Sequence, residues 1–353
     1  MNDNLLQRLL ARIRGRAAPI PIAREVDLVA YQERIAVEQS VFAERIKVHD
    51  LPAIFHYWSN KHLRPRLESF GFSNPDEFFV RYLKQAAQGR QQPARFASLG
   101  SGNCDLEVRL ACALKQAGLQ DFLIECIDIN TAMLERGSAL AREHGVSALI
   151  VPTIGDFNSW RPTHRYAAVI ANHSLHHVLQ LEHLFGAIRD AIDSDGLFLA
   201  ADMIGRNGHQ RWPEALDIVR EFWRELPTGY RYNQQLRRQE DEFLDWDCSG
   251  KSFEGIRAQD ILPLLPEYFH FELFIGFGNI IYPFVDRSFG HHFDAQADWD
   301  RDFIDRVHAR DDAEILAGRI KPTQMFAVLR KKPVAQIACW QHLTPEFCVR
   351  PTS

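Results

Sequence analysis

The sequence is short of the features that mark membrane, metal-binding and nucleic-acid-binding proteins. No apolar run approaches the roughly 20 residues of a transmembrane helix, so we expect no stable membrane insertion. The six cysteines are scattered and none forms a close Cys-x-x-Cys pair, which argues against a zinc or redox site, and we predict no metal ligands. The net charge of −5, without a basic stripe interleaved with aromatic residues, disfavours a nucleic-acid partner.

The N-terminal stretch also lacks the pattern of a secretory signal. Residues 1–23 begin like an amphipathic helix, without a long apolar core or a small-residue cleavage site. Cys112 and Cys126 lie inside apolar runs and are expected to be reduced core residues, which favours a reducing compartment. We therefore expect a cytoplasmic protein.

The length and composition suit one large α/β domain with an accessory part. Of the 353 residues, 46% are hydrophobic and 25% charged, which is enough for a core that needs no metal or disulfide. Two helices are expected before the main domain, over residues 25–49 and 75–88, the second capped by Ser73 or Asn74. The predicted divisions are a helical lid or accessory region, a main domain and a tail: 1–92, 93–333 and 334–353.

From residue 95 to 203, short apolar runs alternate with helical patterns, which predicts a parallel sheet with helices on both faces. The expected strands are 96–100, 122–129, 148–154, 167–172 and 196–203, and the expected helices are 104–117, 130–144, 180–192 and 212–225. Two later strands, 270–278 and 323–331, bring the expected Rossmann-like sheet to seven. The segment 279–322 between them is too long for a hairpin loop and is predicted to be a structured, substrate-side insertion.

Four motifs follow the first four strands. Gly100 and Gly102 in SLGSGNCDLE permit a tight turn and a close backbone approach to a ligand before a helix begins. A nicotinamide dinucleotide fold needs glycine where Asp105 stands, and no Gly-Lys-Ser/Thr follows, which excludes a Walker loop. Asp128 ends the second strand in ECIDIN, and Asp156 follows the third in GDFNSW. Each motif also has a purely structural explanation. The two glycines would form an ordinary turn, Asp128 would cap the following helix, and Asp156 would be an acid of a surface loop.

The ordered set GSG, IECIDIN, GDF and NHSLHHV resembles the class I S-adenosylmethionine-dependent methyltransferase family, over residues 95–203 and more loosely to 331. The resemblance implies a late strand inserted antiparallel. It also implies that a glycine loop faces the methionine part of the cofactor, that carboxylates hold ribose and adenine, and that the fourth-strand exit lies near the sulfonium. The residues implied, in that order along the chain, are Gly100, Ser101, Gly102, Asp128, Ile129, Asp156, Phe157, Asn172 and His173.

Three positions depart from the family pattern. The acidic residue before the glycine loop is Ser98, the third loop glycine is Cys104, and the aspartate that starts the fourth strand is Ala167. We consider Asp105 and Glu107 as replacements for the missing acid at the cofactor amine.

The histidines at the fourth-strand exit are the candidates for catalysis. A neutral imidazole accepts a proton near pH 7, so His176 or His177 is hypothesised to be a general base, against the alternatives of loop packing and a metal site. Asp202 and the pair His291–His292 are considered as additions to this site. Aromatic residues near positions 55–58 and 282–293 suggest an acceptor lid, against ordinary core packing.

The sequence thus predicts methyl transfer from S-adenosylmethionine to a small-molecule acceptor, with O-methylation favoured because histidines crowd the fourth-strand exit. N-, S- or C-methylation of a metabolite or glycan precursor stays open. The rival enzyme class is a nicotinamide-dependent oxidoreductase, which Asp105 disfavours. The rival non-enzyme class is an inactive cofactor-binding protein that acts by protein interaction.

Overall fold

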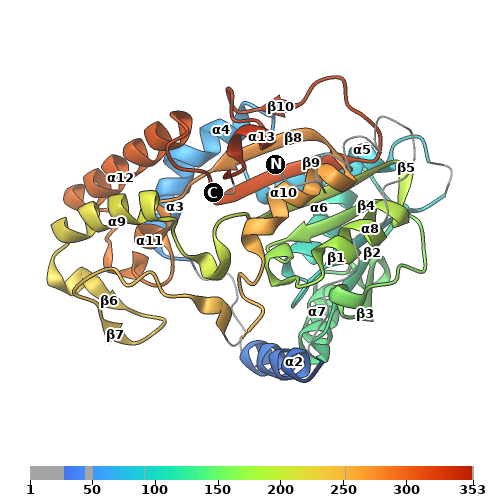
Figure 1. Cartoon of the computed structure of the whole chain (residues 1–353). Coiled ribbons are helices and arrows are strands. Elements are labelled where there is room, and N and C mark those ends of the chain that lie inside the picture. Colours follow the sequence, from blue (N-terminus) through green and yellow to red (C-terminus); the bar gives the residue numbers. More distant parts are fainter. Residues whose placement is uncertain (1–27, 44–50, 91, 251, 352–353) are drawn as a thin grey trace.

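An eight-stranded sheet forms the centre of the computed structural model, which describes residues 28–43, 51–90, 92–250 and 252–351 (Figure 1). Its strands are β1 (Ala94–Leu99), β2 (Phe122–Asp128), β3 (Ile150–Ile154), β4 (Tyr166–Asn172), β5 (Ile192–Met203), β8 (His270–Phe277), β9 (Gln324–Arg330) and β10 (Ala338–Cys339). A separate two-stranded ribbon pairs β6 (Tyr232–Asn233) with β7 (Arg238–Gln239). The predicted α/β, Rossmann-like fold is confirmed.

The strands lie in the order β10-β8-β9-β5-β4-β1-β2-β3. Strands β1 to β5 pair parallel, whereas β9 pairs antiparallel with both β5 and β8. The late strand is therefore inserted antiparallel between two parallel neighbours, as the family resemblance implied. Because β1 and β4 are covered on both faces, nearly all their residues are buried, which explains their continuous apolar runs.

The sheet has one strand more than the seven expected. Residues 338–339 pair in parallel with β8 to form β10, and α13 (Pro345–Cys348) contacts the same edge. The segment 334–353 was predicted only as a tail, because a two-residue strand leaves no apolar periodicity in a sequence. The strand expected over 148–154 also begins later, after a 3₁₀ turn at Ser147–Leu149, and β5 begins earlier than residue 196.

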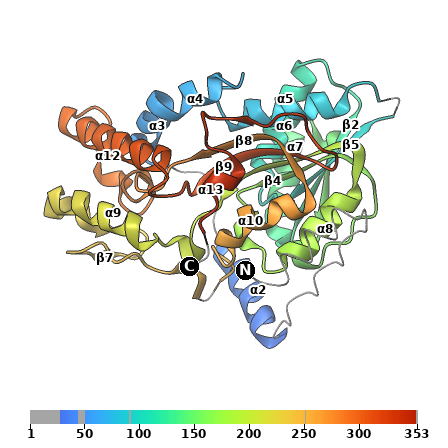
Figure 2. The same ribbon diagram turned by 45° about the horizontal axis from the view of Figure 1, so that its top comes forward.

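Helices cover both faces of the sheet (Figure 2). One layer packs α5 against α6 and α6 against α7, and the opposite layer packs α8 against α10. Their bounds are α5 (Pro75–Ala87), α6 (Asp105–Gln116), α7 (Thr131–Glu143), α8 (Leu181–Ala191) and α10 (Ala258–Tyr268). None of the described helices is long and apolar enough to cross a membrane.

The start of α5 shows why the local sequence specifies a helix. Asn74 is the N-cap, and its side-chain oxygen accepts a hydrogen bond of 3.0 Å from the Glu77 backbone N–H. Ser73 donates from its backbone N–H and hydroxyl to the Glu77 carboxylate, and Pro75 occupies the first helical position. The predicted capping of this helix is confirmed.

Most of the remaining helices form an accessory region beside one end of the sheet. Segments far apart in the chain lie side by side there, with α3 contacting α11 and α12, while α9 and the β6–β7 ribbon lie on the same side (Figure 1). The bounds are α3 (Ala53–Trp58), the π-helix η1 (Ser59–Leu63), α4 (Arg64–Glu68), α9 (Pro213–Glu225), α11 (Tyr282–Val285) and α12 (Asp298–Leu316). Helix α2 (Leu28–Ala43) lies apart from this region and contacts α7 (Figure 1). The segment 279–322 is thus structured, as expected; the helix expected at residues 1–23 lies outside the described residues.

Candidate functional site

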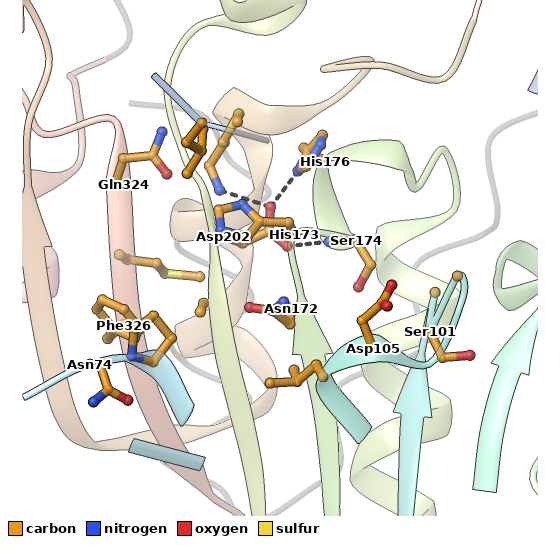
Figure 3. Close-up of a pocket in the computed structure, with 18 of the residues that line it drawn as sticks. Asn74, Ser101, Asp105, Asn172, His173, Ser174, His176, Asp202, Gln324 and Phe326 are labelled. Atoms are coloured by element: carbon orange, nitrogen blue, oxygen red, sulfur yellow. Dashed lines mark hydrogen bonds and ion pairs between the residues drawn. The ribbon is translucent and has the colours of Figure 1, made fainter. Parts of the chain in front are cut away.

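A cavity of about 620 Å³ opens at the carboxyl ends of β1, β2, β4 and β5, where open α/β sheets bind ligands (Figure 3). Both candidate histidines, His176 and His177, line this cavity. Among the residues implied for the cofactor, Asp156 is absent from the lining, and the others contribute to it: Gly100, Ser101, Gly102, Asp128, Ile129, Phe157, Asn172 and His173.

The glycine loop after β1 is shaped by its two glycines. Gly100 has φ +69°, and a Cβ there would lie 2.7 Å from the Ser174 Cβ. Gly102 has φ +53°, and its Cβ would lie 3.1 Å from the Met133 Cε. A side chain at either position would be strained and would fill the space where the backbone lines the cavity. The loop is thereby left open to a ligand.

Asp128 at the end of β2 holds this loop in place. Its carboxylate accepts hydrogen bonds from the backbone N–H groups of Gly102, at 2.9 Å, and Asn130, at 2.8 Å. The Gly100 N–H bonds to the Ile127 carbonyl at 2.8 Å, which ties the loop to the same strand. Asp128 therefore lies where the sequence argument placed it, at the cavity edge, and it also organises the loop.

Cys104 replaces the third loop glycine without opening the packing. It adopts the left-handed conformation, with φ 55°, as the N-cap of α6, and it is fully buried. Opposite it, α7 carries Gly137, where a Cβ would lie 2.6 Å from the Cys104 Sγ. The glycine that the loop lacks is thus supplied by the helix that faces it.

Glu107, on the first turn of α6, points a buried carboxylate at the end of β1. Its Oε1 accepts a 2.6 Å hydrogen bond from the Ser98 hydroxyl, and its Oε2 is buried with no hydrogen-bond partner. Burial raises the pKa of Glu107 to about 7, against the opposing effect of the Ser98 hydrogen bond. Since Glu107 and Ser98 both line the cavity, the carboxylate that the strand lacks comes from the neighbouring helix.

In the loop after β3, the Asp156 carboxylate is already hydrogen-bonded by other parts of the chain. The Asp156 Oδ2 accepts a 2.5 Å hydrogen bond from the Tyr31 hydroxyl of α2, and its Oδ1 accepts one of 2.9 Å from the Asn158 N–H. Phe157 is the residue of this motif that lines the cavity. Helix α2 is thereby attached beside the expected adenine end of the site.

The exit of β4 is fixed by Asp202 at the end of β5, which is almost completely buried. Its carboxylate accepts hydrogen bonds from the backbone N–H groups of Ser174 and Leu175, at 2.8 and 2.7 Å, and contacts the His176 Nδ1 at 2.6 Å. His173 takes a positive φ of 51° at the start of this turn. Asp202 thus positions the turn that carries the histidines, as Figure 3 shows.

The Glu254 carboxylate lies close to three histidines: His176, His177 and His209. Its Oε1 lies 3.4 Å from the His176 Nε2 and 2.5 Å from the His209 Nε2, and its Oε2 lies 3.6 Å from the His177 Nε2. Burial alone disfavours a charged His176, but Asp202 and Glu254 outweigh it and raise its pKa to about 10. Burial lowers the pKa of His209 despite Glu254. The arrangement is a chain of carboxylates and imidazoles along one wall of the cavity.

Sequence reasoning missed His209 and Glu254. Both lie in irregular segments after β5 and before α10, where no periodic pattern or motif indicated a site. Two groups in the described part of the chain place metal-ligating atoms within 4.8 Å of one another: His176, His209 and Glu254, and the fully buried Cys104, Glu107 and Cys126. Cys126 is a buried core residue, as expected, whereas Cys112 is only half-buried and packs against the edge of the core.

Both lid candidates contribute to the cavity wall, although most of their aromatic residues do not. Phe55 and His56 line the cavity from α3, and Tyr282 lines it from α11. Phe284, Phe289 and Phe293 are instead buried in the core. The pair His291–His292 does not reach the cavity, since it is absent from the lining and the His292 Nε2 contacts the Tyr232 carbonyl at 2.7 Å. Its suggested addition to the site was wrong.

The sheet distinguishes between the two enzyme folds considered. A dinucleotide-binding Rossmann sheet continues from its fifth strand directly to its sixth, whereas here antiparallel β9 lies between β5 and β8. The antiparallel late strand is the one that the resemblance to class I methyltransferases implied. The predicted fold resemblance is confirmed, and the nicotinamide-dependent alternative loses its structural basis.

Comparisons with known proteins found distant likenesses to solved structures. No family model matches the sequence, and no curated protein matches it either. A geranyl diphosphate C-methyltransferase from Streptomyces coelicolor A3(2), solved with S-adenosyl-L-homocysteine, is 11% identical, with a TM-score of 0.46 over 85% of this chain and 98% of that one. An O-methyltransferase of a trans-AT PKS multienzyme of Brevibacillus brevis, also with S-adenosyl-L-homocysteine, is 13% identical, with a TM-score of 0.43 over 86% and 85%. Likenesses this distant say nothing of the acceptor.

Proposed function

We propose that this chain is an S-adenosylmethionine-dependent methyltransferase that acts on a small-molecule acceptor. The observation that carries the proposal is the Glu107 carboxylate, which is buried at the cavity wall with one oxygen lacking a partner. The charged form of an acid buried in this way is favoured when a cation binds beside it. The cofactor's α-ammonium group supplies such a cation beside the glycine loop, where the resemblance puts its methionine part.

We assign the other cofactor contacts from the family resemblance; all of these residues except Asp156 also line the cavity. Gly100, Ser101 and Gly102 lie along the methionine part, with Asn172 and His173 beside its sulfonium end. Asp128 accepts the ribose hydroxyls, and three residues hold adenine: Ile129, Asp156 and Phe157. For Asp156, binding requires that the adenine amine take the place of the Tyr31 hydroxyl, which occupies its Oδ2 here.

The cofactor brings an activated methyl group, so the chain's task is to align the acceptor and exclude water. The acceptor side of the cavity has apolar walls from Phe55, Leu63 and Phe326, with Asn60 and Arg64 as polar neighbours. Helices α3 and α4 and the segment 279–322 enclose it, which supports a metabolite-sized acceptor over a polymer. Within the N-terminal region 1–92, we therefore assign the lid to residues 51–68.

We favour an oxygen acceptor and assign His177 as its proton acceptor. His176 is less suited to that role, because it is buried and its Nδ1 contacts Asp202 at 2.6 Å. His177 lines the cavity and is half-buried. Nitrogen, sulfur and carbon acceptors, on a metabolite or glycan precursor, are the alternatives. An inactive cofactor-binding protein would bind the cofactor without turnover.

Titration calorimetry with S-adenosylmethionine, S-adenosylhomocysteine and NAD tests the proposal. We expect binding of the first two and none of NAD. Asp128→Ala should weaken cofactor binding by about 2–4 kcal/mol, from the loss of two charge-assisted hydrogen bonds. The matched control is Asp121→Ala, at the exposed start of the same strand, which should leave affinity unchanged. Equal affinity in both variants, with both folded, would exclude Asp128 as the ribose ligand.

A further inference from the structure

Three loops converge beside the cavity and present two imidazoles and one carboxylate to a common point. His176 belongs to the loop after β4, His209 to the one after β5, and Glu254 to the segment before α10. Their ligand-type atoms all lie within 4.8 Å of one another. We propose that these three side chains form a binding site for a divalent transition-metal ion of the zinc type, on the acceptor wall of the cavity.

The spacing of the three groups suits such an ion. Two ligand atoms about 2.05 Å from a tetrahedral Zn²⁺ are separated by about 3.3 Å. The His176 Nε2 and Glu254 Oε1 lie 3.4 Å apart, which matches this value. The His209 Nε2 is hydrogen-bonded to the same oxygen at 2.5 Å, so an ion needs only to widen this contact by less than about 1 Å.

Asp202 orients the His176 ring so that its other nitrogen is available as a metal ligand. Its Nδ1 contacts the buried Asp202 carboxylate at 2.6 Å and donates its proton there, while Nε2 faces Glu254 and would give up its own proton when an ion binds. A carboxylate behind a histidine is the usual outer partner of a histidine–metal bond, where it fixes the tautomer and increases basicity. Asp202 is itself held by the backbone of Ser174 and Leu175, which keeps the imidazole in place.

The backbone brings the other two ligands together at a conformational cost. His209 takes a positive φ of 56°, which is uncommon for a residue with a side chain. Beside it, Gly208 donates a 2.9 Å hydrogen bond to the Gly255 carbonyl, and a Cβ on Gly255 would lie 3.0 Å from the Gly208 nitrogen. This close glycine contact sets the adjacent residues, His209 and Glu254, side by side.

A further backbone bond connects this pair with the third ligand. The Ile256 N–H donates to the His176 carbonyl at 3.1 Å, so the segment that carries Glu254 is attached to the loop that carries His176. All three ligands are thus held by hydrogen bonds that would exist without an ion. A site preformed in this way loses little conformational freedom when it binds metal.

The donor set indicates which ion fits. Two imidazole nitrogens and one carboxylate favour Zn²⁺, Fe²⁺ or a similar ion, whereas Mg²⁺ and Ca²⁺ prefer oxygen ligands. Because His176 and Glu254 line the cavity, an ion held by them would be accessible from the acceptor side. If the proposed function holds, an ion there binds an oxygen atom of the acceptor and orients it.

The test measures metal binding without cofactor or acceptor. Metal-free protein is titrated with Zn²⁺ by calorimetry, and with Co²⁺ by visible absorption, which reports coordination by nitrogen and oxygen directly. We expect about one equivalent of each ion to bind. His209→Ala and Glu254→Gln should each weaken binding by at least about 10- to 100-fold. His183→Gln, a histidine of α8 that contacts the Trp160 carbonyl, is the matched control and should bind as the parent does.

Each outcome decides the proposal. Loss of binding in the two ligand variants but not in the control supports it, provided that circular dichroism shows both variants folded. If either variant unfolds, the Co²⁺ spectrum of the parent still decides, since absence of ligand-field bands overturns the site. Equal binding by parent and variants also overturns it and leaves a hydrogen-bond network only. S-adenosylhomocysteine binding, measured separately on the same protein, keeps failure of the proposed function distinct.

Discussion

Glu107→Gln separates the role of this carboxylate in stability from its role in binding. In the parent, the Glu107 Oε2 is buried without a partner and the Ser98 hydroxyl donates to Oε1. Glutamine keeps the shape and an oxygen for Ser98, but it removes the charge. Without cofactor, we expect the variant to gain stability relative to the parent as the pH rises. With cofactor, it should lose affinity.

The magnitude follows from the pKa of Glu107, which burial raises from 4.5 to about 7. The folded state binds this proton more tightly than the unfolded state, so the parent loses stability as the pH rises from 4.5 to about 7. At about 1.4 kcal/mol per pKa unit, the charged acid costs about 3 kcal/mol above that range. Between about pH 5 and pH 8, the free energy of unfolding of the parent should therefore fall by about 2–3 kcal/mol relative to that of the variant.

The assay is urea unfolding of both proteins at the two pH values, with and without S-adenosylhomocysteine. Local packing effects of the amide are the same at both pH values, so the change with pH isolates the charge. Loss of the pairing with the cofactor ammonium should weaken binding by about 1.5–3 kcal/mol, or about 10- to 100-fold. Glu143→Gln, at the exposed end of α7, is the control. If the stability difference between parent and variant is the same at both pH values, and the variant binds S-adenosylhomocysteine as tightly as the parent, the reasoning is refuted.

Three further outcomes are expected. Tyr31→Phe frees the Asp156 Oδ2 and should leave cofactor affinity, measured by calorimetry, equal or higher; weaker binding would show that Tyr31 holds the ligand instead. Gly137→Ala places a Cβ 2.6 Å from the Cys104 Sγ and 2.9 Å from the Asn103 carbonyl oxygen and should cost about 1–3 kcal/mol in urea unfolding, of which Cys104→Gly should restore only a part. His177→Gln should lower turnover about 100- to 10,000-fold with cofactor affinity retained, and near-normal turnover would exclude it as the base.

The parts of the fold that carry strong periodicity could be predicted from the sequence. Strands buried on both faces give continuous apolar runs, and β1, β2 and β4 were placed within two residues of their observed bounds. The glycine loop and Asp128 were also placed correctly, because positive φ and a strand end restrict which residues occur there. In contrast, β10 was missed, since its two residues pair through backbone groups that any side chain allows.

The site was less predictable because its parts compensate for one another across the chain. Ser98 and Cys104 look like defects of the family pattern when each is considered alone. In the structure, Glu107 supplies the carboxylate beside Ser98, and Gly137 supplies the space beside Cys104. Both compensations depend on which helix faces which loop, and sequence spacing does not contain that information.

Two acids buried in the same cavity wall show how hydrogen bonding distinguishes a structural carboxylate from one that needs a ligand. Asp202 is bonded to His176 and to the backbone N–H groups of Ser174, Leu175 and Met203. Burial alone would raise its pKa, yet these partners, His176 above all, hold it below the usual value. Glu107 is bonded to a single hydroxyl, and burial raises its pKa to about 7. Asp202 is therefore stable as a charge without any ligand, whereas the charge of Glu107 becomes favourable when a cation binds beside it.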